Sequence, residues 1–255
     1  ETVYKIGGSA FRGCSNLQSV KFPSGLVEIG REAFHKCQNL TEVTLGDTVS
    51  KIDEYAFAEC KALSKVKLPS AMEKINSFMF MNCAKLSSID FPEKITSIGE
   101  SAFEGTGLQT VDLPETLVEI GKNAFKDNNS LKSIAFKEKI QVIGEAAFSG
   151  CDMLTEINLP DSLKQIGRSA FADCGMLEKI RLSNGLTEIP AYAFDLCVSL
   201  KEITLPYRIA SIGDRAFTNC VKLTGITIPR ATKTIADQVF SYPSKMTIYG
   251  VPGTY

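Results

Sequence analysis

Eight cysteines are the most reactive side chains of this sequence, and all of them occupy one repeated position. Each follows a phenylalanine by three residues, and they stand at Cys14, Cys37, Cys60, Cys83, Cys151, Cys174, Cys197 and Cys220. Because a residue that recurs with a repeat has the same surroundings each time, we expect a ladder of reduced, buried thiols. Successive rungs about 5 Å apart would lie within Cα reach of a disulfide, although side chains that all point the same way argue against pairing. Zinc needs four ligands that converge on one point, and a line of thiols does not converge.

Other catalytic motifs are few. The single histidine, His35, follows a phenylalanine at a slot that several residue types fill elsewhere, so we expect an exposed, solvated side chain. One SxxK sequence, Ser64–Lys67, matches the acylating motif of penicillin-binding enzymes, but it lies on a predicted strand and not at a helix start. The sequence has no HExxH, GxGxxG, P-loop or GxSxG motif. We therefore predict a protein that is not an enzyme and that uses no metal and no cofactor.

The element that positions these side chains is a repeat marked by phenylalanine. Its spacing is 23 residues, with one interval of 22 between Phe103 and Phe125. Self-similarity at such a period is the signature of a stacked array. We predict about eleven 23-residue repeats in a single solenoid domain over residues 1–255, with a truncated first repeat at 1–11 and an atypical terminal repeat at 236–255. The marker residues are Phe11, Phe34, Phe57, Phe80, Phe103, Phe125, Phe148, Phe171, Phe194, Phe217 and Phe240.

Each unit follows the pattern AFxxCxxLxxIxLPxxLxxIGxx. The LxxIxL part alternates apolar and polar residues and predicts a strand in a parallel sheet, which a proline such as Pro69 closes because it has no amide donor. The LxxIG part predicts a second short extended segment, with a glycine such as Gly144 at a turn that needs positive φ. The stretch around AFxxC is short, so we predict a single helical or 3₁₀ turn on the convex side.

The LxxIxL segment resembles the strand of a leucine-rich repeat. With its AF pair, cysteine and IG pair, the full unit resembles the BspA-like leucine-rich repeat family of bacterial surface and secreted proteins, over essentially all 255 residues. The asparagine usual after the strand is absent, and Gly25, Thr48 and Ala71 stand in its place. The resemblance implies a leucine-rich-repeat solenoid of the right-handed β/α superhelix type, in which GVPGTY at residues 250–255 begins a terminal cap.

The same resemblance implies a function. It points to a non-catalytic protein- or glycan-binding adhesion module, displayed on or secreted from a bacterial cell. The alternative is an accessory or spacer domain of a larger exported protein or enzyme. Since the chain opens inside a repeat and without a signal peptide, we expect a cut fragment or a processed form.

Net charge and the length of apolar runs limit the classes of partner that we expect. The net charge of −1 gives no basic excess to attract nucleic acid, and no apolar run approaches the 18 residues of a membrane helix. We therefore expect a protein or glycan ligand, no nucleic acid and no membrane insertion. Unpaired strand edges at the two ends of the array predict a monomer or a weak end-to-end association.

The candidate binding face consists of the outward residues of the predicted strands, because repeat arrays usually bind through the concave or lateral face that their strands form. These slots are polar, mixed in sign and free of aromatic residues, although aromatic anchors and arginine dominate binding hot spots. Two interpretations stay open: a solvated face that keeps the array soluble, or a charge-patterned face that binds protein or glycan. The charged candidates are Lys65, Lys67, Asp90, Asp112, Glu156, Lys179, Arg181 and Glu202.

The middle of the array is irregular. Thr106 and Asn128 stand where the neighbouring units carry cysteine. One interpretation is a tolerated turn variant in which Asn128 bonds to nearby backbone. The other is a local change of curvature that shapes a binding surface.

Overall fold

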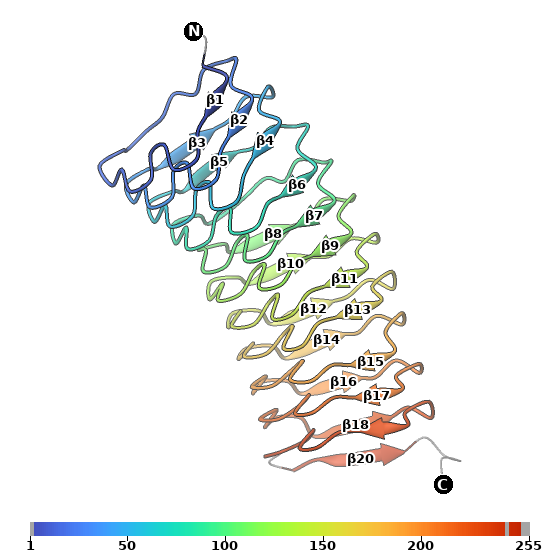
Figure 1. The fold of residues 1–255 in the computed structure, drawn as a ribbon. Helices are drawn as coiled ribbons and strands as arrows, with labels where there is room; N and C mark the ends of the chain where they lie inside the picture. Colours follow the sequence, from blue (N-terminus) through green and yellow to red (C-terminus); the bar gives the residue numbers. More distant parts are fainter. Residues whose placement is uncertain (1–2, 243–244, 251–255) are drawn as a thin grey trace.

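The chain is a parallel β-solenoid of about 11 turns of about 23 residues, as a computed structural model shows (Figure 1). The model describes residues 3–242 and 245–250. The coils stack in sequence order from the N-terminal end to the C-terminal end, as the repeat predicts (Figure 1). The predicted terminal cap falls on residues 250–255, of which 251–255 lie outside the described residues.

The coils contribute short strands to two rows. The first row holds strands of three or four residues from the LxxIxL segment, and we call its solvent side the long-strand face. It comprises β3 (Glu42–Thr44), β5 (Lys65–Lys67), β8 (Thr110–Asp112), β10 (Ser133–Ala135), β12 (Glu156–Asn158), β14 (Lys179–Arg181), β16 (Glu202–Thr204), β18 (Gly225–Ile228) and β20 (Thr247–Gly250).

The second row confirms the second extended segment, with two residues from each LxxIG stretch. It comprises β1 (Lys5–Ile6), β2 (Glu28–Ile29), β4 (Lys51–Ile52), β6 (Lys74–Ile75), β7 (Ser97–Ile98), β9 (Glu119–Ile120), β11 (Val142–Ile143), β13 (Gln165–Ile166), β15 (Glu188–Ile189), β17 (Ser211–Ile212) and β19 (Thr234–Ile235). All pairings in both rows are parallel, between equivalent slots of different coils.

The core is the predicted spine of phenylalanine rings. Neighbouring rings lie 5.1 to 5.9 Å apart between centroids and are nearly parallel, with interplanar angles of 3° to 16°. The rings from Phe34 to Phe194 have no exposed surface, whereas Phe11 in the first coil is 39% exposed. Stacked aromatic pairs contribute free energy beyond that of burial alone. Each coil is therefore stabilised by the rings of the coils on either side of it.

The turn around each phenylalanine is not helical, contrary to the sequence prediction. Residues two before and two after the ring have positive φ, for example Glu32 at 57° and Lys36 at 63°. Because of this alternation, every second backbone amide points toward the next coil. Phe34 N donates to Ala56 O of the next coil at 2.8 Å, whereas His35 N donates to Glu32 O within its own turn at 3.0 Å. A helical turn would use all these donors within one coil, so the stacking hydrogen bonds decide the conformation.

The glycine after the second strand serves a different purpose from the one predicted. Positive φ occurs at Gly13, Gly105 and Gly150, none of which belongs to the IG slot. At Gly144 an added Cβ would meet the backbone of Gly121 and Lys122 at 2.6 Å. The slot therefore favours glycine because neighbouring coils approach closely there, and not because of a left-handed turn.

The cysteine ladder is confirmed for seven of the eight thiols. All eight are free, and only Cys14, in the first coil, is exposed. Each buried sulfur donates to the phenylalanine carbonyl of an earlier coil, as from Cys60 Sγ to Phe34 O at 3.1 Å. Burial raises the pKa of the thiols, to about 11 for Cys37 and about 12 for Cys60. The ladder is thus a set of neutral hydrogen-bond donors.

Asn128 replaces a thiol in this ladder and bonds to nearby backbone, as the turn-variant interpretation expects. Its amide nitrogen donates to Phe103 O at 2.7 Å and to Phe125 O at 2.8 Å, and its side-chain oxygen accepts a hydrogen bond from Thr106. The residue has no exposed surface. The asparagine therefore satisfies the phenylalanine carbonyls where no cysteine is present.

Candidate binding surface

Seven of the eight predicted residues lie on strands of the long-strand face, and Asp90 lies in the equivalent segment of a coil that forms no strand there. All eight side chains are exposed. Strand alternation places them there, since the residues between them, such as Ile157 and Ile180, are buried. The structure brings them together in two places, one at β14 and β16 and one beside β5. Asp112 lies apart from both and pairs with Lys137 at 2.9 Å.

The first place is a hollow of about 580 Å³ that includes Lys179, Arg181 and Glu202, and we call it the β14 hollow. The register puts Glu156 and Glu202 on either side of Lys179. No ion pair holds Lys179 within the described residues, so its ammonium group and the flanking carboxylates face solvent. Charges in this arrangement are available to a ligand.

Arg181 is held in place by residues of the preceding coil. Its guanidinium donates to Leu159 O at 2.7 Å and to an oxygen of Asp161 at 3.0 Å. The backbone amide of Asn184, with help from Arg181, lowers the pKa of Asp161. The carboxylate therefore stays charged and orients the guanidinium of Arg181, which lines the hollow and keeps further donors for a planar acceptor.

Sequence reasoning missed the aromatic residue of this hollow. Tyr207 lines it and is 68% exposed, and the guanidinium of Arg208 lies 5.7 Å from its ring centroid. The outward strand slots before β20 contain no aromatic residue, and β20 carries Tyr249. Tyr207 instead follows β16 by three residues, in a loop that borders this hollow. A search of the loop positions after each strand would have found it.

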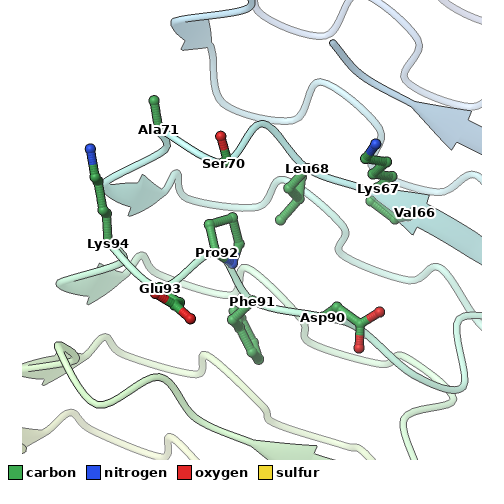
Figure 2. A pocket seen from close by; sticks show the side chains of 10 residues that line it. All are labelled: Val66, Lys67, Leu68, Ser70, Ala71, Asp90, Phe91, Pro92, Glu93 and Lys94. Atoms are coloured by element: carbon green, nitrogen blue, oxygen red, sulfur yellow. The ribbon is translucent and has the colours of Figure 1, made fainter. Parts of the chain in front are cut away.

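The second place is a hollow of about 660 Å³ beside β5, which contains Lys67 and Asp90. Figure 2 shows Lys67 and Lys94 at opposite ends of it, with Asp90 and Glu93 on the following coil. Leu68 and Pro92 line the middle, so an apolar floor is bordered by charges of both signs.

A break in the sheet creates this second hollow. β5 pairs with β3, whereas Ser88–Asp90 in the next coil forms no described strand and pairs with neither β5 nor β8. Val66 is consequently half-buried, although the equivalent Val43 has no exposed surface. The break has no signature in the repeat pattern, because the LxxIxL spacing continues through Ile89.

The environment of His35 also differs from the predicted one. Its side chain is 10% exposed, and its Nε2 lies 3.1 Å from a carboxylate oxygen of Glu59. The other ring nitrogen is buried without a hydrogen-bond partner, 3.9 Å from the Glu32 carboxylate. The carboxylates of Glu32 and Glu59, on the same turn and the next coil, hold the imidazole against the stack.

The described coils contain little else that could support chemistry. No group of three or more His, Cys, Asp or Glu among residues 3–242 and 245–250 is placed to hold a metal ion. Within the same ranges, no helix is long and apolar enough to cross a membrane. What the long-strand face offers is a row of fixed charges with two hollows, which suits binding.

Parallel strands in stacked coils with a shared hydrophobic spine define a leucine-rich-repeat solenoid. The family model for the BspA type leucine rich repeat region matches residues 4–132 and 118–247. The chain belongs to this family.

Solved structures of bacterial proteins are similar to the chain. A leucine-rich repeat protein from Bacteroides ovatus is 29% identical with a TM-score of 0.83, over 92% of this chain and 64% of that one. A leucine rich cell surface protein from Faecalibacterium prausnitzii is 31% identical with a TM-score of 0.65, over 99% of this chain and 77% of that one. The chain thus spans less than two thirds of the Bacteroides structure. The search of curated proteins found no match.

Proposed function

We propose that the chain is a non-catalytic binding module whose long-strand face takes a protein ligand, on the surface of a bacterial cell or secreted from it. The family is one of repeat proteins, and the relative from Faecalibacterium prausnitzii is described as a cell surface protein. The β14 hollow carries the proposal, because it gathers Lys179, Arg181 and Glu202 around the exposed ring of Tyr207.

These residue types suit a protein ligand. Tyrosine and arginine are enriched among the residues that contribute most to protein–protein binding. Tyr207 offers a flat apolar surface, the Arg181 fork suits carboxylates and backbone carbonyls, and the row of Glu156, Lys179 and Glu202 selects a partner by charge. A glycan could use the same ring and polar groups, so the test includes both classes.

The test is a screen of the purified chain on protein and glycan arrays, followed by titration of each hit with variants. We expect Tyr207→Ala and Lys179→Glu each to weaken binding of the true ligand at least tenfold. Lys164→Glu is the matched control, because Lys164 is an exposed lysine of the neighbouring coil that lies beside β13 on the other row.

The outcomes separate the alternatives. Loss of binding with the hollow variants and not with the control supports the long-strand face. If all three substitutions leave the affinity of the ligand unchanged, the binding surface lies elsewhere on the chain. If neither array yields a ligand, the domain acts as an accessory or spacer within a larger exported protein.

A further inference from the structure

A second surface lies on the edge of the solenoid formed by the turns that carry the cysteines. In the C-terminal half, this edge exposes large apolar side chains that the interior does not use. We call them the apolar stripe: Met153 (36% exposed), Met176 (50%), Leu196 (41%), Val198 (37%) and Val221 (38%). They come from the same turn of four consecutive coils. Met153 and Met176 share one slot, and Val198 and Val221 share the slot before it, so residues of successive coils lie near one another along the stack. Contiguous exposed apolar surface of this kind marks an interaction site.

The same turns carry a row of carboxylates beside the stripe. Asp127, Asp152, Asp173 and Asp195 lie close enough to repel one another: burial, and then the charges of Asp173 and Asp127, raise the pKa of Asp152. Burial and Asp173 also raise the pKa of Asp195. Asp152 and Asp173 form no ion pair within the described residues. A cation brought to this row would relieve the repulsion.

The N-terminal half of the same edge has the opposite character. The equivalent turns of the second to fourth coils expose Gln38, Asn39, Lys61 and Lys85. These side chains border a polar hollow of about 580 Å³. The apolar and acidic combination is therefore a local property of the C-terminal coils and not a requirement of the fold.

The spacing of the coils on this side matches a helix. The phenylalanine rings directly behind these turns are 5.5, 5.9 and 5.4 Å apart between Phe148 and Phe217. An α-helix rises about 5.4 Å per turn. A helix lying along the stack would thus place one apolar side chain of each turn against one coil, as in other helix-in-groove complexes.

We propose that the apolar stripe and its aspartate row form a docking surface for a basic amphipathic helix of a partner protein. Methionine-rich apolar surfaces adapt to helices of varied sequence, and the aspartates select lysine and arginine beside the apolar face. The same negative charge disfavours anionic membranes and nucleic acids as occupants. This surface is separate from the long-strand face, so the inference does not depend on the function proposed above.

The test uses a fluorescently labelled probe, a helical peptide of leucine and lysine patterned as an amphipathic helix about four turns long. Controls are the same peptide with its sequence scrambled and a version with glutamate in place of lysine. The full chain is titrated into each by fluorescence anisotropy. We expect the patterned basic peptide to bind at least tenfold more tightly than either control, with affinity that falls as salt is added.

Two variants probe the two halves of the surface. The first, Met153→Gln with Met176→Gln, removes apolar contacts; the second, Asp152→Asn with Asp173→Asn, removes charge. Each should weaken binding at least tenfold, while Lys61→Gln with Lys85→Gln on the polar half of the edge should change it less than twofold. All these side chains are exposed, so the variants and the wild type should have the same melting temperature. If the methionine double variant melts at a lower temperature, the binding result of the aspartate double variant is the one that tests the proposal.

Three results would overturn the proposal. One is a scrambled or acidic peptide that binds as well as the patterned basic one. Another is a variant pair that folds as the wild type does and binds undiminished. The third is a dimer of the chain in sedimentation experiments that the aspartate substitutions abolish, because the stripe would then be an interface between two copies.

Discussion

Cys174 and Met176 lie two residues apart in the same turn, yet they belong to different regions of the molecule. Cys174 is part of the spine, where most coils present the same side chain to their neighbours and the side chains are fully buried. Met176 is on the edge, where the equivalent residue elsewhere is Asn39 or Lys85 and the side chain is half exposed. The spine thus stabilises the fold. Residues on the edge and faces that depart from the repeat pattern make one part of the surface different from another.

The largest effect should come from raising the pH, because it ionises the buried thiols of the spine. The folded state holds seven thiols with raised pKa, whereas in the unfolded chain they ionise near their ordinary value, about 8.5. Stability from the ladder is therefore complete below about pH 8.5, and it falls as the pH rises from there toward the folded-state pKa values, about 11 for Cys37 and about 12 for Cys60. One pH unit costs about 1.4 kcal/mol for each ionising thiol, so seven remove most of a typical stability of about 5–15 kcal/mol.

Urea midpoints measured from pH 7 to pH 10 check this. The control is a variant with every buried cysteine changed to alanine, which is less stable throughout but should lose far less between these pH values. If the urea midpoints of the two proteins fell equally with pH, the buried thiols would not have raised pKa values. Native thiol titration should also find one reactive group, Cys14, and eight after unfolding.

Much of the spine could be predicted from the sequence because its signal is repeated. The stacked rings, the inward leucines and isoleucines and the buried thiols all follow from the same slots in successive units. The turn conformation could not, because residues such as Glu32 and Tyr192 take positive φ without being glycine or asparagine. Only the stacking hydrogen bonds of the assembled solenoid require that conformation.

The surface was harder to predict for the opposite reason. A repeat pattern predicts the residues that recur in each unit, whereas Tyr207 and Met176 are specific to single units or to a few of them. The charged candidates point to solvent, as strand alternation predicts, because alternation is a local rule. Their grouping into two hollows depends on the break beside β5 and on a ring from a loop, and neither has a local signature. His35 was assigned to solvent because nothing in its slot indicates that Glu59 of the next coil covers it.

A spine residue and an edge residue can be compared directly by truncation. Phe148→Ala should lower the free energy of unfolding by roughly 3–5 kcal/mol, because a fully buried ring is replaced by a cavity between two others. Met176→Gln should change it by less than about 0.5 kcal/mol, as is usual for exposed positions. Denaturant unfolding of both variants measures the contrast, and similar costs would mean that the edge also holds the coils together.

Asn128 tests whether the spine needs thiols or only donors. Asn128→Ala should destabilise the chain by roughly 1–3 kcal/mol, because the carbonyl of Phe103 loses its side-chain donor and buried Thr106 loses its partner. Asn128→Cys would restore the donor found in other coils, and with Thr106→Cys it should recover most of the loss. A double variant no more stable than Asn128→Ala would show that this part of the stack has its own geometry.

The smallest effect concerns the backbone of the turns, where spine and edge meet. Lys36 has positive φ at 63°, a conformation that glycine adopts without strain. Its contact with Glu59 at 3.7 Å is partly exposed and contributes little. Lys36→Gly should therefore leave stability unchanged or raise it by up to about 1 kcal/mol. Lys61→Gly, two residues after the equivalent position of the next coil and without positive φ, should lower stability by about 0.5–1 kcal/mol through the entropy of the unfolded chain. Opposite signs at these two exposed lysines in denaturant titrations would show that alternating backbone conformation, and not side-chain contact, forms the turn; equal losses would contradict it.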